Sequence, residues 1–305
     1  MDEFTEYIEY TIAKQLPHKI VFSEEKHVHF WREYLEHPTS LQNFLGKNIQ
    51  IENFKIYIQN HRAGALPVIF IPNRIDFENF LIAYYPKLTK IPLSTNAFFI
   101  KNALNEHRLQ EKKKLYYATI PWDMEYKKIC FLEPWTIRDT FILLTDAPYS
   151  NVHLLEDSWI EKSFKIRLEH EFTHYWIQRL FAPKKTTCLE EILCDWAGCI
   201  AVWNQYNANY ALQFLGIDDS QEETSRFFFY TRSLSRQTQQ YYKSLIQDSL
   251  NHLQQLTEQY YTKENFERFF LTLALFSIKM LSSYLYESYF LKFWEESNNI
   301  KKIFT

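Results

Sequence analysis

A helical pattern of apolar residues begins in the middle of the chain, after Ser158. Apolar side chains then recur at every fourth position, which keeps them on one face of a helix: Phe164, Leu168, Phe172 and Trp176. Ser158 and Glu161 have the spacing of a capping box, a common helix start. Because the residue before a proline disfavours the helical conformation, the pattern predicts a helix that ends before Pro183.

A second helix is predicted directly afterwards, because Thr187 and Glu190 have the same capping-box spacing. Its apolar positions recur at helical spacing: Ile192, Trp196, Cys199, Ile200 and Trp203. All ten prolines lie at or before Pro183, and only two glycines follow it. The second half of the chain is therefore expected to be helical, with long segments over about 222–258 and 263–295.

Before Pro183 the pattern is typical of strands. Residues 49–58 partly alternate between apolar and polar, 68–71 are continuously apolar, and 140–144 are rich in β-branched and aromatic side chains. These segments predict a small sheet.

The fold class expected from these patterns is α+β. Residues 1–157 would form a mixed α/β lobe that contains the sheet, and residues 158–305 a largely helical lobe, together one compact unit. The helix that begins near residue 158 would lie at the centre.

Composition narrows the class of protein. Lys and Arg total 34 and Asp and Glu total 37, for a net charge of −3, so a broad nucleic-acid surface is not expected. The longest basic run, Lys112–Lys114, is expected on a solvated helix face. The apolar stretch 269–281 is shorter than the ~20 residues of a membrane span and is expected to be a buried core helix.

The expected location is the cytoplasm, because no N-terminal signal peptide is visible. Export by a specialised secretion system stays open. The four cysteines fit a reducing compartment better than a disulfide framework: Cys130, Cys188, Cys194 and Cys199.

Residues 170–174 read His-Glu-Phe-Thr-His. On a helix His170 and His174 share one face and can reach a single ion, with Glu171 beside them as a candidate base. Catalytic zinc takes three protein ligands and keeps one position open for water. Glu191, in the first turns of the second predicted helix, is placed to be the third ligand, and Asp195 lies one turn beyond it on the same face.

This pair of motifs resembles the gluzincin metallopeptidases, the thermolysin-like class, whose third ligand lies in an Asn-Glu-x-x-x-Asp-x-x-Gly segment. The residues matched to the family's motifs are the zinc ligands His170, His174 and Glu191, the base Glu171, and Asp195, which would accept a hydrogen bond from the ring N–H of a zinc-bound histidine. The resemblance covers residues 170–198. At its end, Gly198 would let the two helices approach closely.

The chain departs from this family in four respects. Glu190 stands where the family often has Asn, and the interval before Glu191 is a few residues shorter than in thermolysin. Asn96-Ala97 resembles the strand with which the family grips peptides, but it lies far upstream. The residue that would stabilise the oxyanion is not assigned, since His252 is the only histidine after the motif and lacks the family's local pattern.

The function expected is that of a zinc-dependent metallohydrolase, foremost a cytosolic peptidase. Glu171 would activate a zinc-bound water and then pass the proton to the leaving nitrogen. The substrate, a peptide or a protein, would lie in the cleft between the lobes and pair with an edge strand over 141–152. Neither a nucleic acid nor a membrane is expected as a partner.

Several alternatives stay open. The chain could be a zinc enzyme that acts on a small molecule in a biosynthetic pathway, or a metal-stabilised interaction protein without chemistry, for which Glu171 would be dispensable. A Cys194 thiolate could serve as a ligand. Iron or another divalent ion could use the same ligands, although the base beside His170 has a purpose only if a water must be deprotonated.

Overall fold

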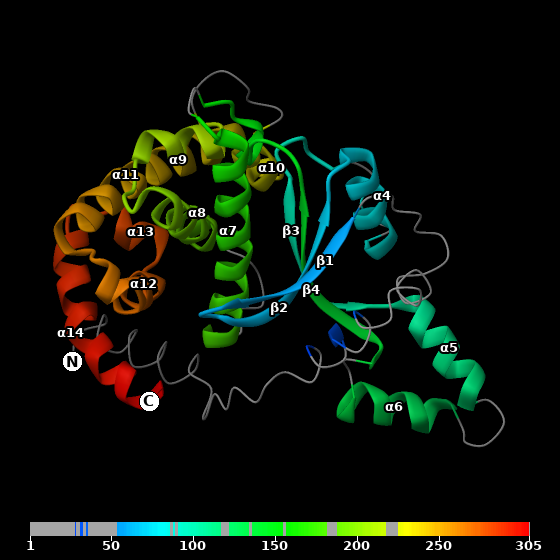
Figure 1. Cartoon of the computed structure of the whole chain (residues 1–305). Helices are drawn as coiled ribbons and strands as arrows, with labels where there is room; N and C mark the ends of the chain where they lie inside the picture. Colours follow the sequence, from blue (N-terminus) through cyan, green and yellow to red (C-terminus); the bar gives the residue numbers. More distant parts are fainter. Residues whose placement is uncertain are drawn as a thin grey trace. The chain divides into compact units, whose positions relative to one another are not determined.

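The computed structural model describes residues 28, 31–32, 35, 54–85, 88, 91–116, 122–133, 136–154, 157–181, 188–217 and 225–304, with side chains up to residue 297. These residues combine many helices with a small sheet, which confirms the predicted α+β class (Figure 1). They fall into two compact units. One contains the sheet and extends to Ala147, and the other is helical, begins at Pro148 and includes Pro92–Ser94.

The sheet has four strands in the order β1-β2-β4-β3 (Figure 1). β1 (Lys55–His61) pairs antiparallel with β2 (Gly64–Ile71), which pairs in parallel with β4 (Arg138–Thr145). β4 also pairs antiparallel with β3 (Ala97–Leu104). Three of these strands coincide with the β-like segments of the sequence. The first part of the first segment, residues 49–53, lies outside the described residues.

The prediction that residues 141–152 supply an edge strand is wrong. β4 lies inside the sheet, with β2 on one side and β3 on the other, and its apolar residues 141–144 are fully buried. A continuous apolar run fits a strand that is covered on both faces. Because β4 pairs with a neighbouring strand on each side, it has no free edge for a peptide. After β4 the chain turns into the short 3₁₀ helix η3 (Tyr149–Asn151).

The helices of the sheet-containing unit whose bounds are described are α4 (Arg74–Tyr84), α5 (Glu106–Tyr116) and α6 (Trp122–Leu132). α4 packs against the sheet through Phe80, whose ring lies 5.9 Å from the ring of Phe141. The basic run Lys112–Lys114 lies on α5 and is half-exposed to exposed, as expected for a solvated face.

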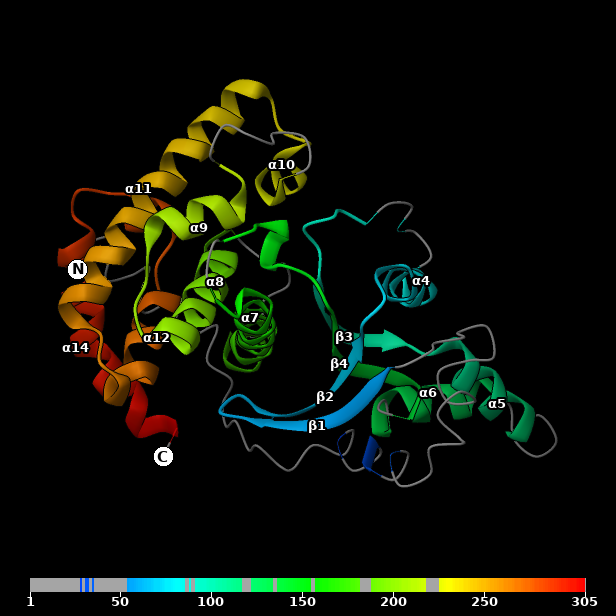
Figure 2. The ribbon, with the colours of Figure 1, turned by 45° about the horizontal axis from the view of Figure 1, so that its top comes forward.

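The helical unit contains η3 and all later helices (Figures 1 and 2). They are α7 (Trp159–Phe181), α8 (Cys188–Trp203), α9 (Ala208–Leu215), α10 (Arg226–Thr231), α11 (Arg236–Tyr260), η5 (Lys263–Asn265), α12 (Phe266–Ala274), α13 (Ile278–Leu281) and α14 (Tyr286–Phe304). α7 and α8 lie side by side in both views, and α9 contacts both α8 and α11.

α7 has the predicted extent but a different start. Ser158 has a left-handed φ of 59°, whereas a capping residue is extended, and Glu161 pairs with Lys165 at 2.8 Å. The predicted capping box is therefore not formed. Thr187, which would begin the second capping box, lies outside the described residues.

The two long segments predicted near the C-terminus are interrupted. Residues 222–258 contain α10 and α11, separated before Ser235, and the apolar stretch 269–281 is divided into α12 and α13 before Ser277. Ser235 and Ser277 accept hydrogen bonds from the backbone N–H groups of Thr238 and Met280. Each serine thus caps a new helix without any proline or glycine nearby.

No helix in the described ranges is both long and apolar enough to cross a membrane. All four cysteines are free thiols.

Candidate metal centre

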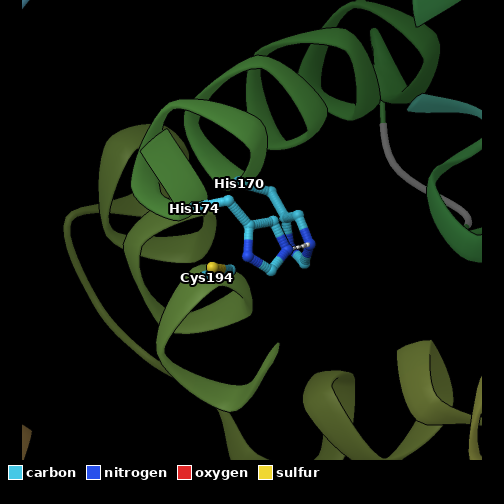
Figure 3. Close-up of side chains that lie close together, drawn as sticks. All are labelled: His170, His174 and Cys194. Carbon is cyan, nitrogen blue, oxygen red and sulfur yellow. Dashed lines mark hydrogen bonds between the residues drawn. The ribbon is translucent and has the colours of Figure 1, made fainter. Parts of the chain in front are cut away.

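The first two predicted ligands lie one turn apart on α7. The Nε2 atoms of His170 and His174 are 3.1 Å apart, and the two rings meet edge to face at an interplanar angle of 75° (Figure 3). The His170 side chain is 7% exposed and that of His174 is 12% exposed. The four-residue spacing therefore brings two imidazoles together inside the protein.

α8 brings three carboxylates to the same place: Glu190, Glu191 and Asp195. All residues of this helix from Leu189 to Ile200 are buried. Buried carboxylates need partners or a metal, so three on one helix indicate a specialised site. Gly198 permits the close contact with α7, because a Cβ there would lie 2.8 Å from Cγ2 of Ile166. The role expected for Gly198 is confirmed.

Each imidazole is oriented by a carboxylate. Nδ1 of His170 lies 2.8 Å from Oδ1 of Asp195 and 2.8 Å from the hydroxyl of Tyr149. Nδ1 of His174 lies 2.8 Å from Oε1 of Glu190. Because an ionised carboxylate only accepts hydrogen bonds, these contacts assign the proton of each neutral ring to Nδ1. Asp195 therefore lies at the ring N–H of His170, the kind of position predicted from the sequence. Glu190 has the same place at the ring N–H of His174.

The two Nε2 atoms consequently direct lone pairs into one space, where Glu191 adds a third acceptor. Its Oε2 lies 3.5 Å from Nε2 of His170, and its Oε1 lies 3.5 Å from Nε2 of His174. Acceptors this close repel one another unless a cation lies among them. In the protein without metal a proton has this role. Burial lowers the pKa of His170, but hydrogen bonds to Asp195 and Glu191 outweigh burial and raise it to about 9.

The three acceptors fit zinc. Ligands about 2.0–2.2 Å from a tetrahedral zinc ion are roughly 3.3 Å apart. The two Nε2 atoms are 3.1 Å apart, and each lies 3.5 Å from a different oxygen of Glu191, Oε2 for His170 and Oε1 for His174. Glu191 is also ionised, as a ligand must be. Burial raises its pKa, but His174, His170 and Arg226 together hold it well below its usual range. Two imidazoles and one carboxylate form a common ligand set of catalytic zinc.

Cys194 is the other possible ligand. Its sulfur and the ring nitrogens of His170 and His174 lie within 4.8 Å of one another (Figure 3). Burial raises the pKa of this thiol well above its usual range, and the charge of Glu191 raises it further. A bound metal would deprotonate the thiol, so Cys194 stays an alternative ligand, whereas Glu191 is already ionised without an ion.

Glu171 lies beside the ligands with its carboxylate available. It is 6% exposed, and within the described part of the chain no side chain hydrogen-bonds to it. Burial raises its pKa, although the charges of His170 and His174 counteract part of this rise. A carboxylate whose pKa is raised towards neutrality suits a group that first takes up a proton and then releases it.

Two buried residues that no sequence motif indicated complete the polar network. Tyr149 of η3 donates a hydrogen bond to Oδ1 of Asp195. Arg226, the first residue of α10, donates to Glu191 at 2.7 Å and to both oxygens of Asp195 at 3.0 Å. Neither lies in a recognisable pattern, because the fold brings them from segments far from the motif.

Tyr230 contributes a hydroxyl from the same helix as Arg226. The hydroxyl hydrogen-bonds with Arg226 and Glu191, and burial followed by the charge of Glu191 raises its pKa well above the usual range. The side chain as a whole is 47% exposed. The hydroxyl end is therefore enclosed at the site and protonated, while the ring reaches solvent.

Two residues considered from the sequence are engaged elsewhere. Nδ1 of His252 lies 2.8 Å from the carbonyl oxygen of Leu281, and its ring stacks on Tyr286 at 3.9 Å. Asn96 is buried in the sheet-containing unit, where its side chain accepts a hydrogen bond from Arg74 at 2.7 Å. The strand that follows it, β3, is at one edge of the described sheet.

Comparison with known proteins identifies one family. No curated protein matches the sequence, and no solved structure matches the fold. Residues 37–284 match the model of a family of unknown function, DUF7005. This match spans most of the chain and includes every residue of the candidate metal centre. The chain therefore belongs to the DUF7005 family.

Proposed function

We propose that this protein is a zinc-dependent hydrolase with His170, His174 and Glu191 as the metal ligands. The observation that carries the proposal is the convergence of three acceptor groups within 3.1–3.5 Å, with both Nδ1 atoms held by carboxylates. Two imidazoles held with the proton on Nδ1 and one ionised carboxylate that converge in this way support a bound metal ion.

Glu171 is proposed to act as the base. When bound, zinc supplies a Lewis acid that lowers the pKa of water at its open position. The Glu171 carboxylate has no competing side-chain partner in the described residues, so it can accept a proton from that water and deliver it to the leaving group. One carboxylate then acts first as base and afterwards as acid.

A peptide or protein is the proposed substrate, because the motifs resemble those of the gluzincin peptidases. The cytosol is the proposed location. The free state of all four cysteines is consistent with a reducing compartment.

The first test measures metal content by mass spectrometry and the hydrolysis of a peptide library. We expect about one zinc per chain in the wild type. Glu191→Ala should lose the metal, because it removes a ligand. Glu171→Gln should keep the metal and lose activity, because the amide cannot take up the proton. Glu161→Gln, an exposed position on the same helix, should change neither property.

A metal-stabilised protein without chemistry is the second candidate. The position of Cys194 favours it, because a fourth protein ligand would close the site. In that case Cys194→Ser would lower the zinc content, and no substrate would be turned over by any variant. Absence of stoichiometric zinc in the wild type, even after zinc is supplied, would contradict both candidates.

A further inference from the structure

Arg226 donates hydrogen bonds to several side chains at the site, among them those of Glu191, Asp195, Tyr149 and Ser150. It is 8% exposed and begins α10 directly after Ser225, which caps this helix. Ser225 is itself fixed against the end of α9, since a Cβ on Gly216 would lie 2.4 Å from the Ser225 Cβ. The guanidinium group is therefore delivered to the site by a constrained segment of backbone.

The guanidinium divides its hydrogen bonds between two carboxylates with different tasks. Nη2 donates to Oε2 of Glu191 at 2.7 Å, and Nη1 donates to Oδ1 and Oδ2 of Asp195 at 3.0 Å each. Nη1 also lies 3.3 Å from the hydroxyl of Tyr149 and 3.2 Å from that of Ser150. The same group thus contacts the proposed ligand Glu191 and the carboxylate that orients His170.

These contacts leave the two oxygens of Glu191 in different situations. Oε2 accepts a short, charge-assisted hydrogen bond from Arg226. Oε1 lies 3.5 Å from Nε2 of His174 and receives no hydrogen bond from Arg226, while Oε2 also lies 3.5 Å from Nε2 of His170. The hydrogen bond uses one of the two lone pairs of Oε2 and draws that oxygen towards Arg226, which favours metal binding through a single oxygen and preserves an open position for water.

We infer that Arg226 is a positioning residue that orients Glu191 to bind the metal through one oxygen. Because Arg226 also holds Asp195, it fixes the position of Glu191 relative to the Asp195–His170 pair. The inference rests on the proposed metal site. Arginine suits this task because its planar fork can hold two carboxylates at once, whereas lysine offers a single point charge. Arg226 also offsets the charge of two buried carboxylates, which would otherwise repel each other.

The test compares the wild type with Arg226→Lys, which keeps the charge and removes the fork. Arg232→Lys is the matched control, because Arg232 is an exposed arginine six residues further along the chain. Zinc affinity is measured by competition with a chromophoric chelator, and coordination by the visible absorption spectrum of the cobalt-substituted protein. We expect Arg226→Lys to lower zinc affinity by roughly 10- to 100-fold and to weaken the cobalt bands as the coordination number rises.

The readouts separate positioning from a general effect on folding. An arginine that only stabilises the fold would lower the melting temperature in Arg226→Lys but leave the affinity and the cobalt spectrum unchanged, and that result would overturn the inference. If the lysine variant does not fold, Arg226→Gln is measured in the same way, with the same expectation. A wild type that binds neither zinc nor cobalt would instead overturn the proposed function.

Discussion

The residues of the site are arranged so that each proton has a defined position. Both Nδ1 atoms face carboxylates at 2.8 Å, the Tyr149 hydroxyl donates to Asp195, and Glu171 carries a pKa raised by burial. Tyr230 is the remaining donor whose hydroxyl lies at Glu191, and its raised pKa keeps it protonated. A neutral hydroxyl that exchanges its contact with Glu191 for a substrate oxygen is suited to stabilise the negative charge that develops there.

Tyr230→Phe is therefore expected to reduce kcat by about 10²- to 10³-fold while zinc content stays at the wild-type level. The substitution removes one hydroxyl and keeps the ring. Tyr241→Phe, an exposed tyrosine of α11, is the matched control and should be fully active. Steady-state kinetics with a peptide found in the library screen provides the measurement. Equal turnover by the two variants would eliminate Tyr230 as the oxyanion donor.

The sequence predicted some of these residues because they lie on two successive helices. His170, His174, Glu191 and Asp195 follow helical spacings, so the ligand geometry is largely contained in residues 170–198. Arg226 could not be predicted in this way, because its partners depend on how α10 returns to α8 after an intervening segment. A buried arginine carries no periodic signal of its own.

At the scale of elements, the site depends on the contact between α7 and α8. α8 is buried along most of its length, so its three carboxylates can be held only if the two backbones stay close. Gly198 provides this proximity: a Cβ there would lie 2.8 Å from Cγ2 of Ile166 and 2.9 Å from its carbonyl oxygen. The backbone oxygen cannot rotate away as a side chain can, so the helices themselves would have to move.

Gly198→Ala should therefore destabilise the protein by about 1–3 kcal/mol despite the better helix propensity of alanine. It should also weaken zinc binding, because the shift separates Glu191 from the two histidines. Chemical denaturation and zinc titration measure the two effects. Ala201→Ser, an exposed change on the same helix, is the control. A variant with wild-type stability and zinc affinity would show that the close packing is not required.

The helix boundaries show the limit of periodicity. The apolar pattern predicts one helix, but a break before Ser277 divides it into two. The Ser277 hydroxyl accepts a hydrogen bond from the backbone N–H of Met280 and so caps the second helix. Serine occurs both inside helices and at their starts, so this choice is made by tertiary packing. The strand β4 was predicted in the right place. Its inner position in the sheet depends on pairing with β3, and no alternation of apolar and polar residues had predicted β3.

At the scale of the whole molecule, the buried histidines connect stability to pH. Folding raises the pKa of His170 to about 9. It also raises the pKa of His174, because the charge of Glu191 and a hydrogen bond to Glu190 outweigh burial. A group whose pKa is higher in the folded state binds protons more tightly there. Its stabilising contribution is thus complete below the unfolded value near 6.5 and is lost as the pH rises towards the folded value.

The metal-free protein should accordingly lose on the order of 1 to 3 kcal/mol of unfolding free energy between pH 6 and pH 8. Zinc should reverse this trend, because it replaces the protons on the two imidazoles and therefore binds more tightly as the pH rises. The thiols near the site do not interfere, since burial raises the pKa of Cys188 to about 12 and the pKa values of Cys194 and Cys199 well above their usual range. Melting temperatures with zinc and with a chelator, at both pH values, measure the effect. The increase caused by zinc should be larger at pH 8, and a larger increase at pH 6 would show that the ion does not displace these protons.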